Sequence, residues 1–430
     1  MKIKVTIVCL LLLCLGWYQT VDAVFLASSK YGGHIKAAEA YEKKEIYEDA
    51  LTEYQAALAL EPESTEAKLR IANMYLQLDN RADFIASCEG LIHQKTVNED
   101  ALKMLTDYYD QNGRQEDIVS LLKQLRTEHS EESAVQKYWE KYRGCYEELY
   151  YSYEALDPFC GNTAVAYNGE GYGLIGTNGE VVFAANYDAV TPFSSEEGVA
   201  AVSENGTWYY MNTKYHKKIV PDEAYDYLGV FSEGVAVVGK SGKFGYADYS
   251  MEQKKKCEYD TASNFYAGVA AVEKGGKWEL LGSDFSSITD ASYGDVAIDE
   301  AGFCSKQERI FAKQKGSYLM LDTEGNQIGE LLFEDAKPFG EDELTAVCMN
   351  GKWGFVNREG EIKIPCSYED AKTFAYGAAP VKKDGKWGYV DSAGNEIIAP
   401  LFEDAYPFNK DSIAPVKDKN WFLIRLYALQ

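Results

Sequence analysis

One sequence pattern, clearest at residues 351–360 and 385–394, recurs over most of the chain and restricts its fold more than any other feature. About eight copies follow one another between residues 153 and 430. A period of this length indicates units that bury their apolar faces against one another. Each copy centres on one aromatic residue, at spacings of 36, 36, 34, 40, 35, 34 and 34: Tyr172, Trp208, Phe244, Trp278, Tyr318, Trp353, Trp387 and Trp421.

Each copy predicts a small set of strands, because Val, Tyr, Phe and Ile alternate with polar residues between turn residues. Pairs such as Asn350-Gly351 and Asp384-Gly385, just before the central aromatic, have the chemistry of a two-residue hairpin turn. Asp or Asn followed by Gly predicts a second turn after it. A segment rich in aromatic and acidic residues opens every unit except the fifth, which lacks it near residues 288–294: 153–159, 187–193, 225–231, 259–265, 333–339, 368–374 and 402–408.

The pattern G-K-W-G-[FY]-V-[DN]-x-x-G at residues 351–360 and 385–394 resembles the WG repeat family, also called KWG repeats. The resemblance covers residues 153–430. It implies repeated β units in a bacterial protein, frequently exported and mostly without an assigned activity. The Gly that follows the central aromatic is present at positions 173, 245, 354 and 388, and is replaced by Tyr209, Glu279, Leu319 and Phe422.

Two assemblies of the β units are open. Radial repetition of three- or four-stranded sheets gives a propeller-like array, which we favour, and an open stack of hairpins gives a β-hairpin solenoid. Ring closure has one obstacle in the sequence, because the eighth unit stops nine residues after Trp421. No strand is predicted before Tyr153 to complete it.

Residues 31–152 have a helical pattern that also repeats every 34 residues, which resembles tetratricopeptide repeats. Weaker second and third copies follow the first, and a helix at residues 131–150 is predicted to cap them. The resemblance implies an α-solenoid whose concave surface holds a peptide or a helix of another protein. A rigid spacer is the alternative. The positions that carry the first copy are Ala38, Tyr41, Tyr47, Ala50, Tyr54, Ala57 and Pro62.

Residues 1–27 begin with Lys2 and Lys4 and continue as an apolar run, which predicts either an uncleaved signal anchor or a cleaved signal peptide. The expected location is the cell membrane with the bulk outside the cytoplasm, or secretion after cleavage. The formal net charge of −25 disfavours nucleic acid as a partner, since it repels polyanions. Contact with the membrane is expected through the N-terminal segment only.

No constellation in the sequence predicts catalysis, a cofactor or a metal. The four histidines have unlike surroundings, and the Asp-x-x-Gly turns lack the closely spaced oxygen ligands of a calcium loop. The central aromatics are interpreted as core residues, with a ligand-stacking platform as the alternative. We therefore expect a non-enzymatic exported or membrane-tethered repeat scaffold that binds proteins or peptides. The alternative is a module that binds carbohydrate of the cell envelope.

Overall fold

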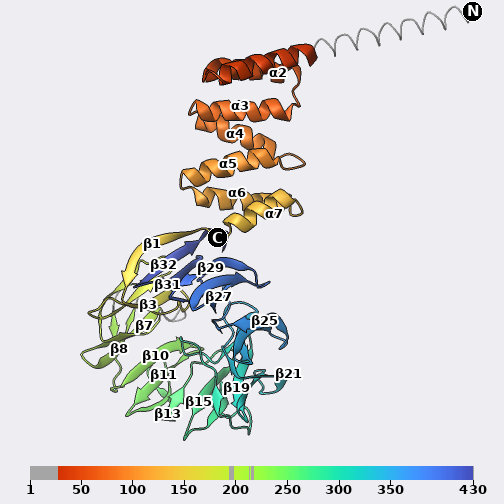
Figure 1. The fold of residues 1–430 in the computed structure, drawn as a ribbon. Helices are drawn as coiled ribbons and strands as arrows, with labels where there is room; N and C mark the ends of the chain where they lie inside the picture. The colour runs from red at the N-terminus through yellow and green to blue at the C-terminus, as the bar shows by residue number, and fades with distance from the viewer. Residues whose placement is uncertain (1–27, 193–197, 213, 215–216, 430) are drawn as a thin grey trace, which may run out of the picture. The chain divides into compact units, whose positions relative to one another are not determined.

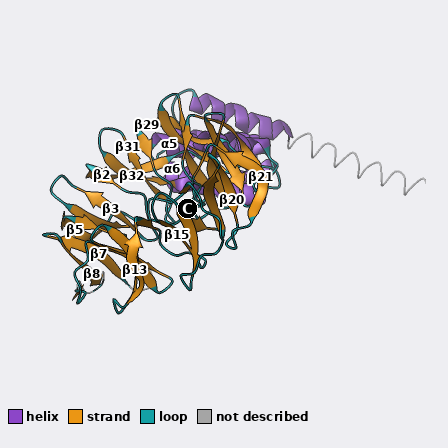
Figure 2. Cartoon of the chain, turned by 90° about the horizontal axis from the view of Figure 1, so that it is seen from below, coloured by secondary structure: helices purple, strands orange, loops and turns teal. Residues whose placement is uncertain are grey.

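The computed structural model describes residues 28–192, 198–212, 214 and 217–429, and it divides the chain into two units, Met1–Tyr142 and Arg143–Gln430. Figure 2 shows that the α-helices belong to the first unit and the strands to the second. The signal anchor or signal peptide expected at residues 1–27 lies outside the described residues.

Seven helices are described in the first unit (Figure 1). Ala38, Ala50 and Ala57 are fully buried, so neighbouring helices approach closely around the buried Tyr54 ring. Side chains of Ser64, Asn80 and Asn98 accept hydrogen bonds from first-turn backbone amides, which explains where three helices begin. The helices are residues 28–42, α2 (Tyr47–Leu60), α3 (Thr65–Gln77), α4 (Arg81–Ile92), α5 (Glu99–Gln111), α6 (Gln115–Glu128) and α7 (Ser133–Tyr142).

The second unit is an eight-bladed β-propeller in its described part, so the favoured assembly is confirmed and the open solenoid is wrong. Seven blades begin with a strand of two residues: β2 (Ala155–Leu156), β6 (Ala189–Val190), β14 (Thr261–Ala262), β17 (Asp295–Val296), β22 (Asp335–Ala336), β26 (Asp370–Ala371) and β30 (Asp404–Ala405), with the longer β10 (Tyr227–Ser232) in the third blade. The second strands are β3 (Thr163–Tyr167), β7 (Val199–Glu204), β11 (Val235–Lys240), β15 (Val269–Glu273), β19 (Arg309–Gln314), β23 (Leu344–Met349), β27 (Ala378–Lys383) and β31 (Ile413–Lys417).

The third strand of each blade carries the central aromatic: β4 (Tyr172–Gly176), β8 (Thr207–Asn212), β12 (Lys243–Asp248), β16 (Trp278–Gly282), β20 (Ser317–Leu321), β24 (Lys352–Asn357), β28 (Lys386–Asp391) and β32 (Trp421–Leu426). The outer strands are β5 (Val181–Tyr187), β9 (Lys218–Ile219), β13 (Gln253–Tyr259), β21 (Gln327–Phe333), β25 (Ile362–Tyr368), β29 (Glu396–Phe402) and β1 (Tyr146–Tyr153). Isolated bridges replace a regular outer strand in the fourth blade, the short strand β18 (Ser305–Lys306) adds to the fifth, and the 3-10 turn η1 (Tyr427–Leu429) follows β32.

The ring closes through β1, which pairs antiparallel with β32 and completes the eighth blade (Figure 1). An ion pair of 2.9 Å between Arg425 Nη1 and Glu147 Oε2 joins the two strands. The prediction that no strand precedes Tyr153 is therefore wrong. The helix predicted at residues 131–150 ends at Tyr142, and the β unit begins at Arg143 rather than at residue 153.

The fifth blade retains its opening segment, contrary to the sequence prediction. Tyr293 bridges to Trp278, and the two-residue strand β17 follows it at the equivalent place. Asp299 occupies the position at which the other opening segments have Phe. Tyr318 follows Tyr293 by 25 residues, whereas Trp387 follows Tyr368 by 19, so the extra residues of the fifth unit lie after Asp299 and not before it.

The acidic residue in the opening segment has a structural task. Glu334 accepts hydrogen bonds from the backbone amides of Asn350 and Gly351, at 3.1 and 2.8 Å. Both turn residues have positive φ, of 54° and 67°, which confirms the predicted hairpin chemistry. Four other blades have the same carboxylate-to-turn contact: Asp188 to Gly206, Asp226 to Ser241, Asp260 to Gly275 and Glu369 to Gly385.

The Gly after the central aromatic is explained by a bulge in the outer strand. Trp387 pairs with Phe402 but Tyr389 pairs with Ile398, so the outer strand has two extra residues opposite Gly388. A Cβ atom at Gly388 would lie 2.4 Å from the Ile398 carbonyl oxygen. The backbone therefore leaves no room for a side chain there, as it also does at Gly173, Gly245 and Gly354.

Arg143, the first residue of the β unit, holds a turn in the seventh blade. Asp391 Oδ1 accepts the backbone amides of Ala393 and Asn395, at 3.0 and 2.8 Å, which is turn chemistry as predicted. Asp391 Oδ2 accepts Arg143 Nη1 at 2.8 Å, and Arg143 Nη2 donates to the Glu396 carbonyl at 2.7 Å. Burial raises the pKa of Asp391, but the bonds to Asn395 and Arg143 outweigh it and lower the pKa below the ordinary value.

We predict that Asp391→Asn lowers the free energy of unfolding by about 1–3 kcal/mol more than Asp322→Asn, because Arg143 donates a hydrogen bond to Asp391, whereas Asp322 is affected by Arg309 through its charge alone among the described contacts. Asp322 makes the same turn contacts with Glu324 and Asn326, so it is a matched control. A carboxyl group whose pKa is lower in the folded state stabilises the fold at pH values above its unfolded-state pKa. This stabilisation is lost as the pH falls through the folded-state pKa. Urea unfolding should therefore show the full difference near neutral pH and a difference that shrinks progressively as the pH falls below about 4. Equal losses in the two variants would contradict the role of Arg143.

Candidate functional sites

The central aromatics differ in burial, although the sequence treats them as one set. Tyr318, Trp353, Trp387 and Trp421 are buried, whereas Trp208, Phe244 and Trp278 are half-buried and Tyr172 is 40% exposed. Lys337 and Lys372 place their ammonium groups 5.3 and 4.8 Å from the ring centres of Trp353 and Trp387. Their role as repeat-core residues stays a prediction, and Tyr172 is the member whose exposure suits that role least.

In four blades a second, more deeply buried aromatic residue lies two residues further along the third strand, and the sequence analysis did not single it out. Tyr210, Tyr246, Phe355 and Tyr389 are at most 2% exposed. The tyrosine hydroxyl groups donate to backbone carbonyls in the opening segment of the next blade, to Gly229, Ser263 and Tyr406. The even spacing from the central aromatic was the signal available, since it places both rings on one face of the strand.

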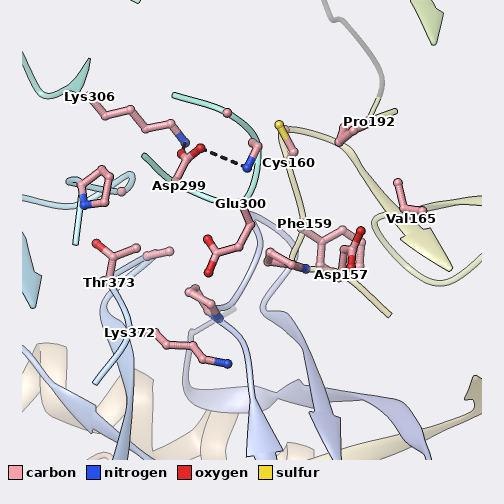
Figure 3. A pocket seen from close by; sticks show the side chains of 18 of the residues that line it. Asp157, Phe159, Cys160, Val165, Pro192, Asp299, Glu300, Lys306, Lys372 and Thr373 are labelled. Atoms are coloured by element: carbon pink, nitrogen blue, oxygen red, sulfur yellow. Dashed lines mark hydrogen bonds and ion pairs between the residues drawn. The ribbon is translucent and has the colours of Figure 1, made fainter. Parts of the chain in front are cut away.

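A cavity of about 760 Å³ lies in the β unit at the place where the blades converge (Figure 3). Six of the eight blades contribute the residues that follow their first strands. A site on the flank of a propeller would touch one or two neighbouring blades, so this cavity lies on the axis of the ring. The segments that line it are 157–161, 189–192, 298–302, 337–341, 370–376 and 407–409, with Val165, Trp208, Tyr227 and Lys306.

The extra residues of the fifth blade enter this cavity. Asn264 donates from its side chain to the Ala301 carbonyl and from its backbone to the Gly302 carbonyl, which holds the loop against the fourth blade. Asp299 accepts the backbone amides of Ala301 and Phe303. The Glu300 side chain extends into the cavity on the side where Thr373 lies, and Asp157 lies on the opposite side of Glu300 (Figure 3).

Two lysines of the cavity wall are engaged by carboxylates. Lys306 Nζ lies 3.5 Å from Asp299 and 3.6 Å from Glu341. Burial lowers the pKa of Lys306, but these two carboxylates outweigh it and raise the pKa above the ordinary value. Lys372 Nζ lies 2.7 Å from Asp404, and burial lowers its pKa despite that partner. Neither lysine is available as a free cation.

Cys160 is the thiol of the cavity wall. Burial raises its pKa to about 11, so the thiol is protonated at neutral pH and is a weak nucleophile. His34, His93 and His129 lie in the helical unit near glutamates, and His216 lies outside the described residues. Within the described residues, no group of three or more His, Cys, Asp or Glu side chains could hold a metal ion.

The helical unit has a groove of about 490 Å³ between α3 and α5. Leu69, Leu76, Met104 and Tyr108 give it an apolar floor of half-buried side chains. Charged residues border the groove, and Lys103 pairs with Asp107 at 2.6 Å. The sequence predicted a concave binding surface only through the tetratricopeptide resemblance and named none of these residues.

Comparison with known families decides the nature of the repeats. The model of the WG containing repeat matches residues 172–208, 224–244, 244–278, 320–353, 353–387 and 387–420. The β unit carries WG-containing repeats. The family match omits residues 279–319, which include the fifth-blade loop that enters the cavity. No curated protein matches the chain.

Several solved structures resemble part of the chain. A crystal structure of a eukaryotic initiation factor has a TM-score of 0.44 and 11% identity, covering 66% of this chain and 87% of that one. The dihydro-heme d1 dehydrogenase NirN in complex with DHE has a TM-score of 0.42 and 11% identity, covering 66% and 74%. Kluyveromyces lactis Hsv2 has a TM-score of 0.33 and 10% identity, covering 61% and 93%. These scores support no inference about function.

We predict that Trp387→Ala lowers the free energy of unfolding by about 3–5 kcal/mol, as expected for a large buried ring. Tyr172→Ala, the matched change in the first WG repeat, should cost less than about 1 kcal/mol because Tyr172 is 40% exposed. Denaturant unfolding of the two variants checks this. A Trp387→Ala variant with unchanged stability would show that this ring is not a core residue.

Proposed function

We propose that the chain is a non-enzymatic scaffold that binds protein partners. The WG-repeat propeller is a rigid ring of this kind, and propellers of repeated blades suit a protein-interaction role. The helical unit is, in this proposal, a set of tetratricopeptide-like repeats rather than a spacer. The observation that carries the proposal is the groove between α3 and α5.

The groove has the chemistry of a peptide site. Its floor of leucine, methionine and tyrosine accepts apolar side chains, and methionine adapts its shape to what it binds. Asn73 and Gln111 line the groove with amide groups that can bond a peptide backbone. Asn73 Nδ2 already lies 3.4 Å from Glu42 Oε1, so a neighbouring helix positions this amide. A peptide that presents apolar residues between polar ones fits this floor.

We predict that Met104→Glu reduces recovery of partner proteins by about tenfold or more, because a carboxylate on the apolar floor is costly to bury without a partner. Affinity purification with the full chain from solubilised membranes, followed by mass spectrometry, measures this. Leu121→Glu on α6 is the control, since Leu121 is also half-buried but does not line the groove. Equal recovery with Met104→Glu and Leu121→Glu would contradict the groove site. Retention of the chain on purified wall glycan, with elution by free sugar, would favour the carbohydrate-binding alternative.

We also propose that residues 1–27 anchor the chain in a membrane with both units outside the cytoplasm. The support is the sequence pattern of Lys2 and Lys4 before an apolar run. In the described part of the chain, no helix is both long and apolar enough to cross a bilayer.

The anchor predicts that protein purified from the membrane fraction begins at Met1. N-terminal sequencing or intact-mass measurement tests this directly. A soluble form that begins after a cleavage site in residues 20–28 would contradict the anchor and support a signal peptide.

A further inference from the structure

The cavity on the propeller axis has no assigned occupant. Its volume of about 760 Å³ falls in the range of sites that enclose small organic molecules. Phe159, Pro192, Phe339 and Phe408 give it apolar wall segments from four different blades. The charged groups between these segments determine which class of molecule it suits.

The cavity has an excess of negative charge. Its lining includes five carboxylates, Asp157, Asp299, Glu300, Glu341 and Asp370, against three ammonium groups, Lys306, Lys337 and Lys372. The surrounding unit adds to this, because residues 143–430 contain 27 Lys and Arg against 45 Asp and Glu. A concave site within a field of one sign concentrates the opposite charge.

The wall shows how this cavity holds an ammonium group. Lys372 Nζ lies 2.7 Å from the Asp404 carboxylate, 3.8 Å from the centre of the Tyr406 ring and 4.8 Å from that of Trp387. A carboxylate and aromatic faces together are the environment that stabilises an organic cation away from bulk water. Lys337 also lies over a ring, that of Trp353.

Three of the five lining carboxylates have no ion pair in the described part of the chain. Ion pairs engage Asp299 and Glu341 but none of Asp157, Glu300 and Asp370, and Asp370 accepts the backbone amide of Ala371. Asp157 is exposed at the cavity surface, but the protein atoms around its carboxyl group and the nearby Glu300 charge raise its pKa above the ordinary value. The repulsion between these two groups is what a bound cation would relieve.

We propose that the cavity binds an organic cation, an alkylammonium or guanidinium group on an apolar stem, between Asp157 and Glu300. The stem contacts the Phe159 and Pro192 side of the wall. Two sources supply this chemistry, a free polyamine and the lysine or arginine side chain of a protein. The second source rests on the proposed scaffold function, because the side chain then belongs to a partner.

The experiment is isothermal titration calorimetry of the full chain with two probes at about 0.15 M salt. One probe is spermidine, and the other is an acetylated and amidated Gly-Gly-Arg-Gly-Gly peptide. Binding of either probe at one site per chain is expected. Glu300→Gln and Asp157→Asn should each weaken it by about tenfold, as expected for loss of a charge-assisted contact.

Glu330→Gln is the matched control, because Glu330 is exposed on β21 and lies outside the cavity. This substitution changes the net charge by the same amount as Glu300→Gln. Glu300 is itself exposed on a loop, so its substitution should leave melting unchanged. Glu300→Lys is a second variant that places a cation in the cavity and should abolish binding. Binding of spermidine alone assigns a free amine, and binding of the peptide alone assigns a partner side chain.

Three outcomes would overturn the proposal. These are no binding of either probe, binding at many weak sites, or equal affinity in Glu300→Gln, Asp157→Asn and Glu330→Gln. The scaffold function fails independently, because its test uses Met104 in the helical unit. Loss of partner recovery with Met104→Glu together with unchanged spermidine binding would show that the two sites are separate.

Discussion

The pairing of β1 with β32 is the constraint on which the β unit depends. Each blade buries one face against the blade before it and the other against the blade after it, and an open array would leave two apolar faces exposed. The tyrosine hydroxyl groups that donate to the following blade, as Tyr389 does to Tyr406, repeat this dependence around the ring. Residues 146–153 close the circle, and the axial cavity exists only because they do.

The repeat and its hairpins could be predicted from the sequence because their determinants are local. Asn350 and Gly351 adopt positive φ within a turn of two residues, and the acid that caps them recurs at a constant offset. Closure was missed because its determinant is not local. Residues 146–153 are rich in acidic and aromatic residues and follow a helical segment directly, so their sequence does not indicate a strand. Their partner strand lies almost 280 positions later in the chain.

The candidate cavity could not be predicted for a related reason. Asp157, Glu300 and Lys372 belong to three different blades of the propeller. The sequence does not indicate that they line one cavity, because only the closed ring brings these blades together. The prediction that the fifth repeat lacks this segment near residues 288–294 was wrong, because the segment begins at Tyr293 and has Asp299 where the others have Phe. The 40-residue spacing in that unit was visible in the sequence, but it did not reveal on which side of the strand the extra residues lie.

Repeated and unrepeated positions therefore have different tasks. Gly388 fits the bulge of the outer strand, Glu334 caps a hairpin turn and Tyr389 contacts the next blade. Equivalent residues recur along the chain because these three features recur in the blades, so the architecture of the ring is enough to explain them. Glu300 has no counterpart in other units, and the loop that presents it requires its own contacts with Asn264. A loop that adds a carboxylate without an ion pair in the described residues to an already acidic cavity does not help the ring to form, since like charges repel. Its chemistry is better explained by an occupant of opposite charge than by the architecture.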